Sequence, residues 1–292
     1  GRVTPMEFFT RGQQLRCIAQ LYHAASHRGI ILTTRQKDNI FFNGGHVEDP
    51  RAGFWKLVIC FDFNSLYPSI MIAYNICFTT LLRHPEDMEE NMVNKFSIDQ
   101  EEPEKWEPKD DDNFDYGDYF KNEDEEVKDN VVKRHYDFGF VKKEVQPGLL
   151  PDILDNLLTN RKATKKNMKK IVKQMDAMDD NVLTILRNNE NVKLKDLNNE
   201  GKEIVKSYYE NLNDDSNISE FKKDLEDKFF ALKVKETMLD SRQLGLKVSA
   251  NSMYGFLGAQ KFGKYSLIEG SMCVTSRGRE LIKQSGEFFE NE

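Results

Sequence analysis

Two long helical patterns constrain the fold of this chain more than any other feature. The first begins at Leu149-Leu150-Pro151, with an apolar stripe on one side and a row of basic residues, four apart, that starts at Arg161 on another. The second spans about residues 221–253, and the Asn- and Asp-rich residues 176–220 between them should contain helical turns. The sequence therefore predicts a helical hairpin with an enlarged tip.

A short apolar run directly before Asp62 predicts a strand. Residues 57–61 are rich in β-branched and aromatic side chains, which is typical of a strand packed on both faces. The residues around Pro68 predict a helix that begins near Ser65, so its first backbone N–H groups should lie beside Asp62. The Asp62 carboxylate in this position either caps the turn or binds a metal ion.

Upstream of this strand the sequence predicts a helix and a tight turn. The helix covers residues 8–28 and ends at Gly29. Its apolar positions are Leu15, Ile18, Ala19, Tyr22 and Ala25. Asn43-Gly44-Gly45 has the composition of a tight turn, so the first third of the chain is expected to form a helix, a hairpin and a strand.

A group of polar side chains shares one face of the second long helix. Gln243, Lys247, Asn251 and Tyr254 are separated by four, four and three residues, and the helix is expected to end at Gly255. Such a face is either solvated, with the tyrosine packed at its rim, or part of a binding site. Because the first helix carries a comparable basic stripe, we favour a site for a polyanion the size of a nucleoside triphosphate.

The excess of acidic residues that gives the chain its net charge of −7 is concentrated in one segment. Residues 85–130 contain nineteen acidic residues and five lysines, which leaves 37 basic and 30 acidic residues in the rest of the chain. The field at a groove depends on where charges lie, so this acidity does not exclude a nucleic-acid partner. We interpret residues 85–130 as a solvated insertion without periodic structure.

Composition indicates a soluble intracellular protein that does not enter a membrane. No apolar run approaches the roughly 18 residues of a membrane helix, and no signal peptide opens the sequence. The cysteines at positions 17, 60, 77 and 273 lie far apart, so we expect reduced thiols.

Three motifs, in this order, resemble the family B DNA polymerases. They are Asp62-x-x-Ser65-Leu66-Tyr67-Pro68-Ser69-Ile70, Arg161-Lys162 and Lys247-x-x-x-Asn251-Ser252-x-Tyr254-Gly255. The neighbouring sequence is most similar to the delta type, at Arg11-Gly12-Gln13-Gln14, Thr79-Thr80-Leu81-Leu82, Gly148-Leu149-Leu150-Pro151 and Thr275-x-x-Gly278-Arg279-Glu280. Phe42-x-Gly44-Gly45 resembles the linker between exonuclease and palm, with Phe in place of the usual Tyr.

The resemblance implies an α+β fold, with a polymerase palm (an antiparallel sheet with helices on one face) and a helical fingers hairpin, together incomplete. The implied divisions are 1–56 for the end of the exonuclease–palm connection and the N-terminal palm, 57–84 for the palm with the first catalytic motif, 85–145 for an acidic variable insertion, 146–255 for the fingers and 256–292 for the continuing palm. The second catalytic motif and a thumb are not found, so we expect a fragment that is inactive alone.

The implied reaction is template-directed DNA synthesis, in which dNMP is transferred from dNTP to a primer 3′ end with two Mg²⁺ ions. Asp62 and the backbone carbonyl of Phe63 are the implied metal ligands, and the N–H groups of Ser65, Leu66 and Tyr67 should face the β and γ phosphates. The Tyr67 ring would lie under the sugar and exclude a 2′-hydroxyl.

The remaining implied contacts concern the triphosphate and the template. Arg161, Lys165, Lys247 and Asn251 would bind the triphosphate, and Lys247 would also protonate the departing pyrophosphate. The expected contacts with the base pair or template are Tyr254, Gly255, Gly44 and Gly45. Expected partners are primer–template DNA, dNTP and, in the full-length protein, a sliding clamp.

Two alternatives stay open at this point. The chain could be a noncatalytic nucleic-acid-binding remnant, which an Asp-x-Asp motif soon after residue 292 would exclude. It could also belong to a polymerase with another sugar preference. The expected location is the nucleus or a viral replication compartment, and the Asn- and Lys-rich insertions suggest an AT-rich source such as a large DNA virus.

Three further motif-like segments are better explained without a site. Tyr116-Gly117-Asp118 imitates the second catalytic motif but precedes the second long helix. Residues 258–264 nearly spell a phosphate-binding loop, but Tyr265 replaces the Ser or Thr that would bind magnesium. His23 and His27 are four apart without the Glu of a zinc motif, so we interpret them as a surface pair.

Overall fold

The computed structural model describes residues 3–32, 41, 43–47, 52–82, 84, 86, 88–103, 131–189, 191–209, 212–259 and 265–290. The chain divides into two compact units, which are described in turn. The first comprises residues 1–156 and 249–292, and the second comprises residues 157–248. Phe42 and Tyr116-Gly117-Asp118 lie outside the described residues, as do residues 260–264.

The first unit begins with two helices where the sequence predicted one. Helix α1, Pro5–Thr10, starts at Thr4, whose side chain and that of Glu7 form a capping box. Helix α2, Gln13–His27, follows after Arg11, whose backbone is extended and therefore interrupts the helix. The predicted end is correct, because Gly29 has a φ of 65°.

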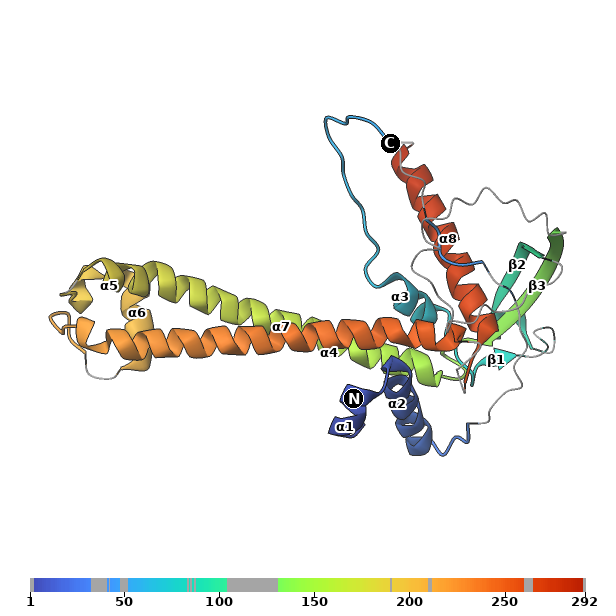
Figure 1. Ribbon diagram of the computed structural model, residues 1–292, viewed down its shortest axis with the longest axis horizontal. Coiled ribbons are helices and arrows are strands. Elements are labelled where there is room, and N and C mark those ends of the chain that lie inside the picture. The colour runs from blue at the N-terminus through green and yellow to red at the C-terminus, as the bar shows by residue number, and fades with distance from the viewer. Residues whose placement is uncertain are drawn as a thin grey trace. The chain divides into compact units, whose positions relative to one another are not determined.

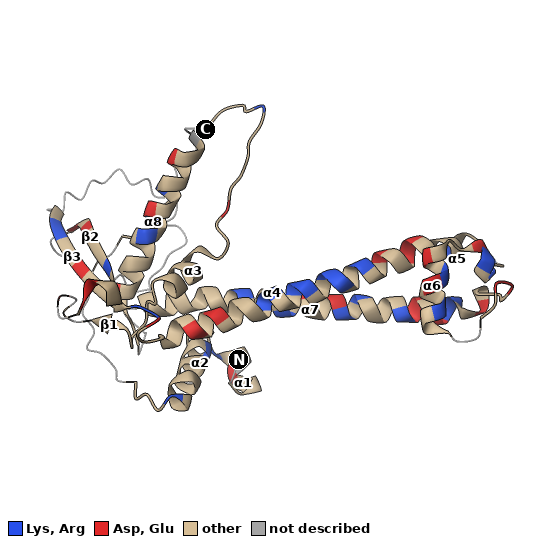
Figure 2. Ribbon diagram, turned by 180° about the vertical axis from the view of Figure 1, so that it is seen from behind, with Lys and Arg blue, Asp and Glu red and all other residues tan. Residues whose placement is uncertain are grey.

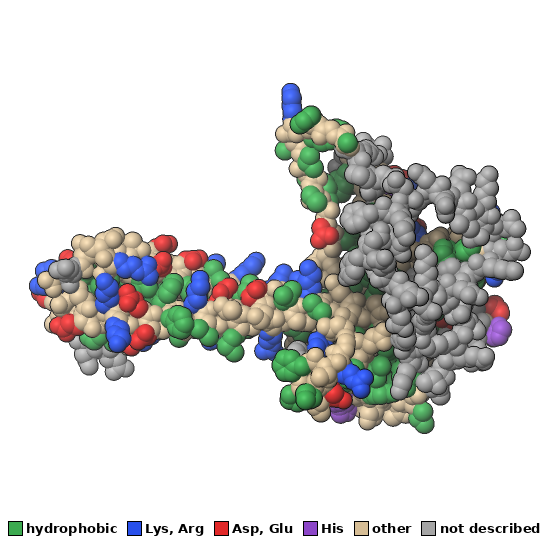
Figure 3. All heavy atoms as spheres, viewed as in Figure 1, with side chains coloured by type: hydrophobic (Ala, Val, Ile, Leu, Met, Phe, Trp, Pro, Cys, Tyr) green, Lys and Arg blue, Asp and Glu red, His purple; other side chains and the backbone are tan. Residues whose placement is uncertain are grey.

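The predicted buried strand at residues 57–61 is wrong. The segment forms no strand, and its side chains are exposed by 79% at Leu57, 73% at Val58, 67% at Ile59 and 63% at Phe61. Figure 3 shows hydrophobic side chains on this projecting segment. A strand needs a hydrogen-bonded neighbour, and the described strands pair only with one another. Asp62 therefore lies at the end of an exposed segment rather than of a buried strand.

Helix α3, Leu66–Ala73, begins after Ser65, as the sequence predicted. Ser65 itself adopts a left-handed conformation with a φ of 56°, and its carbonyl accepts the first helical hydrogen bond from Ser69 N at 2.9 Å. Helix α3 contacts helix α8, Ile268–Glu290 (Figure 1). Arg277 of α8 donates from Nε to Tyr74 Oη at 2.6 Å, which fixes α8 against the end of α3.

A three-stranded antiparallel sheet has the order β1-β3-β2, formed by Leu81–Leu82, Val131–Val141 and Val93–Pro103. Strand β2 pairs with β3 along its full length, from Val93 opposite Val141 to Pro103 opposite Val131. Residues 93–103 are therefore periodic, contrary to the expectation of an aperiodic insertion over 85–130.

The physical reason for this difference is charge pairing across the two strands. Arg134 Nε lies 2.5 Å from Glu102 Oε1, and Lys133 Nζ lies 3.2 Å from Glu101 Oε1. The acidic residues of β2 thus face basic partners that are distant in sequence, which a count over residues 85–130 could not reveal. Residues 104–130 lie outside the described part of the chain.

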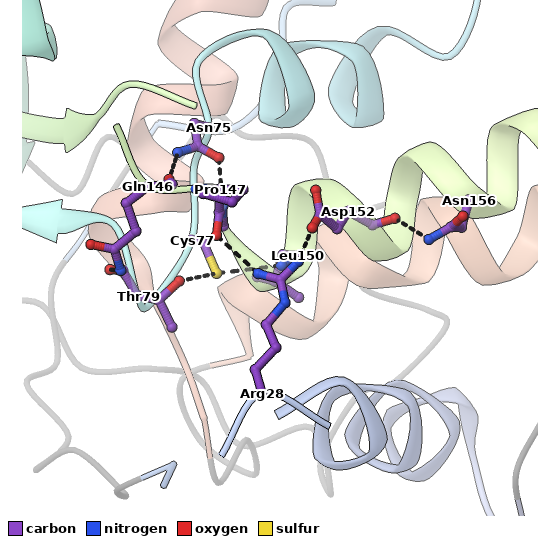
Figure 4. A network of polar contacts seen from close by, with 10 residues as sticks. Arg28, Asn75, Cys77, Thr79, Gln146, Pro147, Leu150, Asp152 and Asn156 are labelled. Atoms are coloured by element: carbon purple, nitrogen blue, oxygen red, sulfur yellow. Dashed lines mark hydrogen bonds and ion pairs between the residues drawn. The ribbon is translucent and has the colours of Figure 1, made fainter. Parts of the chain in front are cut away.

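A buried polar network connects the end of α3 to the start of α4, Leu149–Met178 (Figure 4). Asn75 is fully buried, has a φ of 55°, and donates from Nδ2 to the carbonyls of Val141 (2.7 Å) and Gln146 (2.8 Å). The backbone N–H of Gly148 donates to Asn75 Oδ1 at 2.9 Å. Asn75 therefore satisfies three backbone groups and sets the position where α4 begins.

Arg28 fastens the N-terminal helices to the same place. Its Nη1 donates to the carbonyl of Pro147 at 3.0 Å, and its guanidinium pairs with Asp152 in the first turn of α4 (Figure 4). The core of this unit contains Met71, Phe140 and Met272, contributed by α3, β3 and α8, all fully or almost fully buried.

The second unit contains the hairpin arms and the tip. The arms are the parts of α4 and of α7, Lys222–Gly258, that lie within residues 157–248. The tip has helices α5, Thr184–Asn188, and α6, Asn199–Tyr208, together with a π-helical segment, Asp179–Leu183, and two 3-10 helices, Leu194–Asp196 and Ser219–Phe221. Its core includes Met178, Leu183, Val205 and Leu225.

The mixed α+β class predicted from the sequence is confirmed, with an antiparallel sheet and two long helices. The predicted helix end at Gly255 is wrong, because α7 continues to Gly258. Among the described residues, none of the helices has the length and apolar character that a membrane crossing requires.

Candidate functional site

The candidate metal ligands Asp62 and Phe63 lie directly before α3. Both side chains are exposed. Within the described residues, no three His, Cys, Asp or Glu side chains converge as a metal site. Mg²⁺ is usually bound by one or two carboxylates, with water and substrate phosphates completing the shell. Asp62 suits one such position, but the donor set within the described residues is incomplete.

The ring of Tyr67, in the first turn of α3, lies among residues from three distant segments. A Cβ atom built on Gly45 would lie only 2.3 Å from Tyr67 Oη. A Cβ atom built on Gly278, in α8, would lie 3.2 Å from Tyr67 Cε1. Both glycines therefore approach the tyrosine at distances that a larger residue would disturb.

Tyr254, near the end of α7, packs against the same ring. The centroids of the Tyr67 and Tyr254 rings are 4.5 Å apart, with the planes inclined by 42°. Burial, and to a smaller extent the nearby Tyr67, raises the pKa of Tyr254 to about 12. The Tyr254 hydroxyl is therefore protonated at neutral pH, and its ring lies against that of Tyr67.

Arg279 of α8 completes this cluster. Its Nη1 donates to the carbonyls of Asn43 at 3.0 Å and Gly44 at 2.6 Å. Burial lowers the pKa of Arg279, while Tyr67 and Tyr254 act in the opposite direction. The guanidinium thus ties the segment that contains Gly45 to the helix that contains Gly278, and this clamp holds both glycines near the tyrosine.

Of the predicted site residues, Gly45 and Tyr254 lie against Tyr67, and Gly44 is held beside them by Arg279; their roles stay predictions. Sequence reasoning missed Arg279 and Gly278 as members of this cluster. Both residues belong to the Thr275-x-x-Gly278-Arg279-Glu280 motif, which could have marked them as site residues but was taken only as a sign of the delta type. Asn251 and Gly255 lie on the same stretch of α7 as Tyr254 and are exposed.

Of the other predicted residues, Ser65 and Leu66 lie at the start of α3 in the first unit, and Arg161, Lys165 and Lys247 belong to the hairpin unit. Arg161 Nε donates to Gln243 Oε1 at 3.4 Å, a contact between α4 and α7. Lys165 and Lys247 are exposed, and neither forms an ion pair within the described part of the chain. The structure therefore joins the two basic stripes through Arg161 and Gln243 and leaves both lysine amines available to a ligand.

Two comparisons with known proteins agree. Residues 3–186 and 218–292 match the sequence profile of DNA polymerase family B. The chain is 30% identical over 301 residues to the DNA polymerase delta catalytic subunit of Drosophila melanogaster and 29% identical over 299 residues to that of Arabidopsis thaliana. Each alignment covers 100% of this chain but 19% of the relative, so the chain spans about a fifth of their length.

Proposed function

The chain belongs to the family B DNA polymerases, and from this premise we propose that it forms the nucleotide-binding part of a template-directed DNA polymerase. The proposed reaction transfers dNMP from dNTP to the 3′ end of a DNA primer. The observation that carries the proposal is the confinement of Tyr67 by Gly45, Gly278 and Tyr254.

A confined aromatic ring is suited to sugar selection. A 2′-hydroxyl placed against the Tyr67 ring would lose water without gaining a hydrogen bond there, and it would also collide with the ring. Because the ring is packed on several sides, it cannot move away at low cost. We propose that Tyr67 excludes ribonucleotides in this way, while Tyr254 and the Gly44–Gly45 segment contact the nascent base pair and template.

The triphosphate would be bound by Arg161, Lys165, Lys247 and Asn251. Arginine and lysine side chains supply the cationic donors that phosphate oxygens require. In this proposal Lys247 also donates a proton to the departing pyrophosphate. The exposure of Lys165 and Lys247 supports the availability of their amines.

Asp62 and the carbonyl of Phe63 would supply part of a Mg²⁺ site, and bound Mg²⁺ would stabilise charge on the reacting phosphate. Further proposed partners are primer–template DNA and, for the whole protein, a sliding clamp. A noncatalytic nucleic-acid-binding remnant is the alternative, and an exposed Asp62 is compatible with it.

Sugar discrimination by the whole protein, expressed from the complete reading frame that encodes this chain, tests the proposal. Single-nucleotide primer extension with dCTP and CTP should favour dCTP strongly for the wild type, and Tyr67→Ala should reduce this preference while extension with dCTP persists. Equal use of dCTP and CTP by the wild type would refute the sugar gate. Absence of extension by that reading frame, with an intact fold, would favour the noncatalytic alternative.

A further inference from the structure

The hairpin unit carries a second row of cations that the proposed triphosphate contacts do not use. From Asn156 to Met175, helix α4 contains one arginine and six lysines and no acidic residue. The lysines are Lys162, Lys165, Lys166, Lys169, Lys170 and Lys173, and all six are exposed. Figure 2 shows these basic positions following one another along α4.

The seven cations occupy one side of the helix. At 3.6 residues per turn they fall within about half of its circumference. The opposite side contains Thr164, Ile171 and Met175, which are buried. The cationic side is therefore directed away from the packed side of α4.

Within this cationic side, two rows can be distinguished. Arg161 contacts Gln243 of α7 and so marks the edge nearest that helix. The first row consists of Arg161, Lys165 and Lys169. The residue that follows each of them lies further round the helix, on the far edge. These three residues, Lys162, Lys166 and Lys170, form the second row, which we call the outer lysine row. In the described part of the chain, none of these three side chains forms an ion pair or hydrogen bond.

An unpaired row of like charges is unfavourable unless a polyanion or counterions neutralise it. The outer lysine row advances about 6 Å per side chain, because each step is four residues with a rise of 1.5 Å. A nucleic-acid strand carries one negative charge per nucleotide along a flexible backbone and can follow such a row. The negative charge of a nucleoside triphosphate is concentrated on three adjacent phosphates, whereas the row extends along about 12 Å of helix, so a strand with one charge per nucleotide matches the row better.

We propose that the outer lysine row binds the phosphodiester backbone of a single nucleic-acid strand, separately from the triphosphate contacts at Arg161 and Lys165. The choice of nucleic acid over other polyanions rests on the proposed function. Lysine binds phosphate as a point charge and does not read bases, so the contact would be independent of sequence.

The test measures binding of a fluorescein-labelled 20-nucleotide oligo-dT to residues 1–292 by anisotropy at several salt concentrations. The variant is Lys162→Gln, Lys166→Gln and Lys170→Gln together, because Gln retains helix propensity while removing charge. The matched control is Lys223→Gln, Lys233→Gln and Lys235→Gln on α7, which removes the same charge from exposed positions. Circular dichroism verifies that each protein is folded.

We expect the α4 variant to lower the slope of log K against log salt by about 2, since each phosphate contact on a single strand contributes about 0.7. At 0.1 M salt this corresponds to binding weaker by about tenfold to a hundredfold. The α7 control should change the slope little.

Equal losses in both variants would overturn the proposal, since net charge would then account for binding. An unchanged α4 variant, or no measurable oligonucleotide binding by the wild type, would overturn it as well. Polyglutamate of matched length is the comparison ligand. If polyglutamate binds as tightly as oligo-dT, and the α4 variant loses that binding, the row recognises an acidic protein segment instead. A failed sugar-selection test with intact oligonucleotide binding would reject the sugar gate alone.

Discussion

Replacing Gly45 with Ala gives a direct test of how Tyr67 is confined. The added Cβ would lie 2.3 Å from Tyr67 Oη, whereas ordinary contacts begin at 3.4 Å, so the two atoms must separate by about 1 Å. Overpacking of this kind usually costs about 1–3 kcal/mol. We expect Gly45→Ala to lower the free energy of unfolding by that amount and to shift the Tyr67 ring.

Gly44 provides a matched control at the adjacent position. A Cβ atom on Gly44 would meet nothing within 4 Å, and Gly44 does not have a positive φ. Gly44→Ala should therefore be neutral or should stabilise the protein by up to about 1 kcal/mol, through the lower entropy of the unfolded chain. Urea denaturation of both variants, followed by circular dichroism, measures the difference.

Tyr67→Phe identifies the atom responsible. Without the hydroxyl, the nearest Tyr67 atom to the added Cβ is Cζ, at 3.7 Å, which is an ordinary contact. In the Tyr67→Phe background, Gly45→Ala should thus cost less than about 0.5 kcal/mol, which gives a coupling energy of about 0.5–3 kcal/mol in the double-mutant cycle. An equal penalty in both backgrounds would refute the steric reasoning, because the clash would then involve another group.

Three other predictions concern separate parts of the structure. In a spectrophotometric titration at 295 nm, Tyr254 should ionise near pH 12, and Tyr254→Phe should remove this step. Because folding raises the pKa of Tyr254, the stability that the protonated hydroxyl contributes is complete below about pH 10 and is lost as the pH rises through about 12. A Tyr254 step near pH 10 would contradict the burial. Asn75→Ala should destabilise the protein by about 3 kcal/mol or more, since three buried backbone groups lose their partner, and Asn75→Gly should lose nearly as much although glycine accepts the φ of 55°. Full stability of Asn75→Gly in urea denaturation would show that the backbone conformation, not the hydrogen bonds, is what matters. For the polymerase activity proposed for the whole protein, Lys247→Ala should reduce the single-turnover rate far more than DNA affinity, and an unchanged rate would exclude Lys247 as the proton donor.

The long helices could be predicted from the sequence because their signals are local. The apolar periodicity at the start of α4 and the polar face of α7 depend on residues within a few turns of one another. The end of α7 was missed by three residues, since Gly255 can remain helical when nothing requires a left-handed residue there.

The strands were harder to predict because pairing is not local. Residues 57–61 have the composition of a buried strand, yet composition does not supply a hydrogen-bonded neighbour. For β2 the error was to predict no strand. Its acidic residues were interpreted as solvated, but in the fold they pair with Lys133 and Arg134 of β3. In both cases the deciding residues lie far away in the sequence.

The candidate site combines residues that motifs could identify with contacts that they could not. Tyr67 and Tyr254 were recognisable from their motifs, but their 4.5 Å contact depends on α3 and α7 meeting. Arg279 lies in a motif, but the motif does not indicate its partners, because its acceptors are the carbonyls of Asn43 and Gly44, more than 230 positions earlier. Only the fold shows that one side chain joins both glycine segments.

The glycines of the candidate site are consequently not equivalent, although the sequence gives them the same residue type. Gly45 and Gly278 are required to be small, because Tyr67 lies where their Cβ atoms would be or would crowd. Gly44 and Gly255 have open space where a Cβ atom would lie. Arg279 binds the backbone carbonyl of Gly44, which any residue at that position would also supply. Confinement of the Tyr67 ring therefore depends on Gly45 and Gly278, with Arg279 fixing the distance between their segments. Under the proposed sugar gate, replacing Gly278 in α8 with Ala should then change the preference for dCTP over CTP in primer extension, because the added Cβ would crowd the Tyr67 ring.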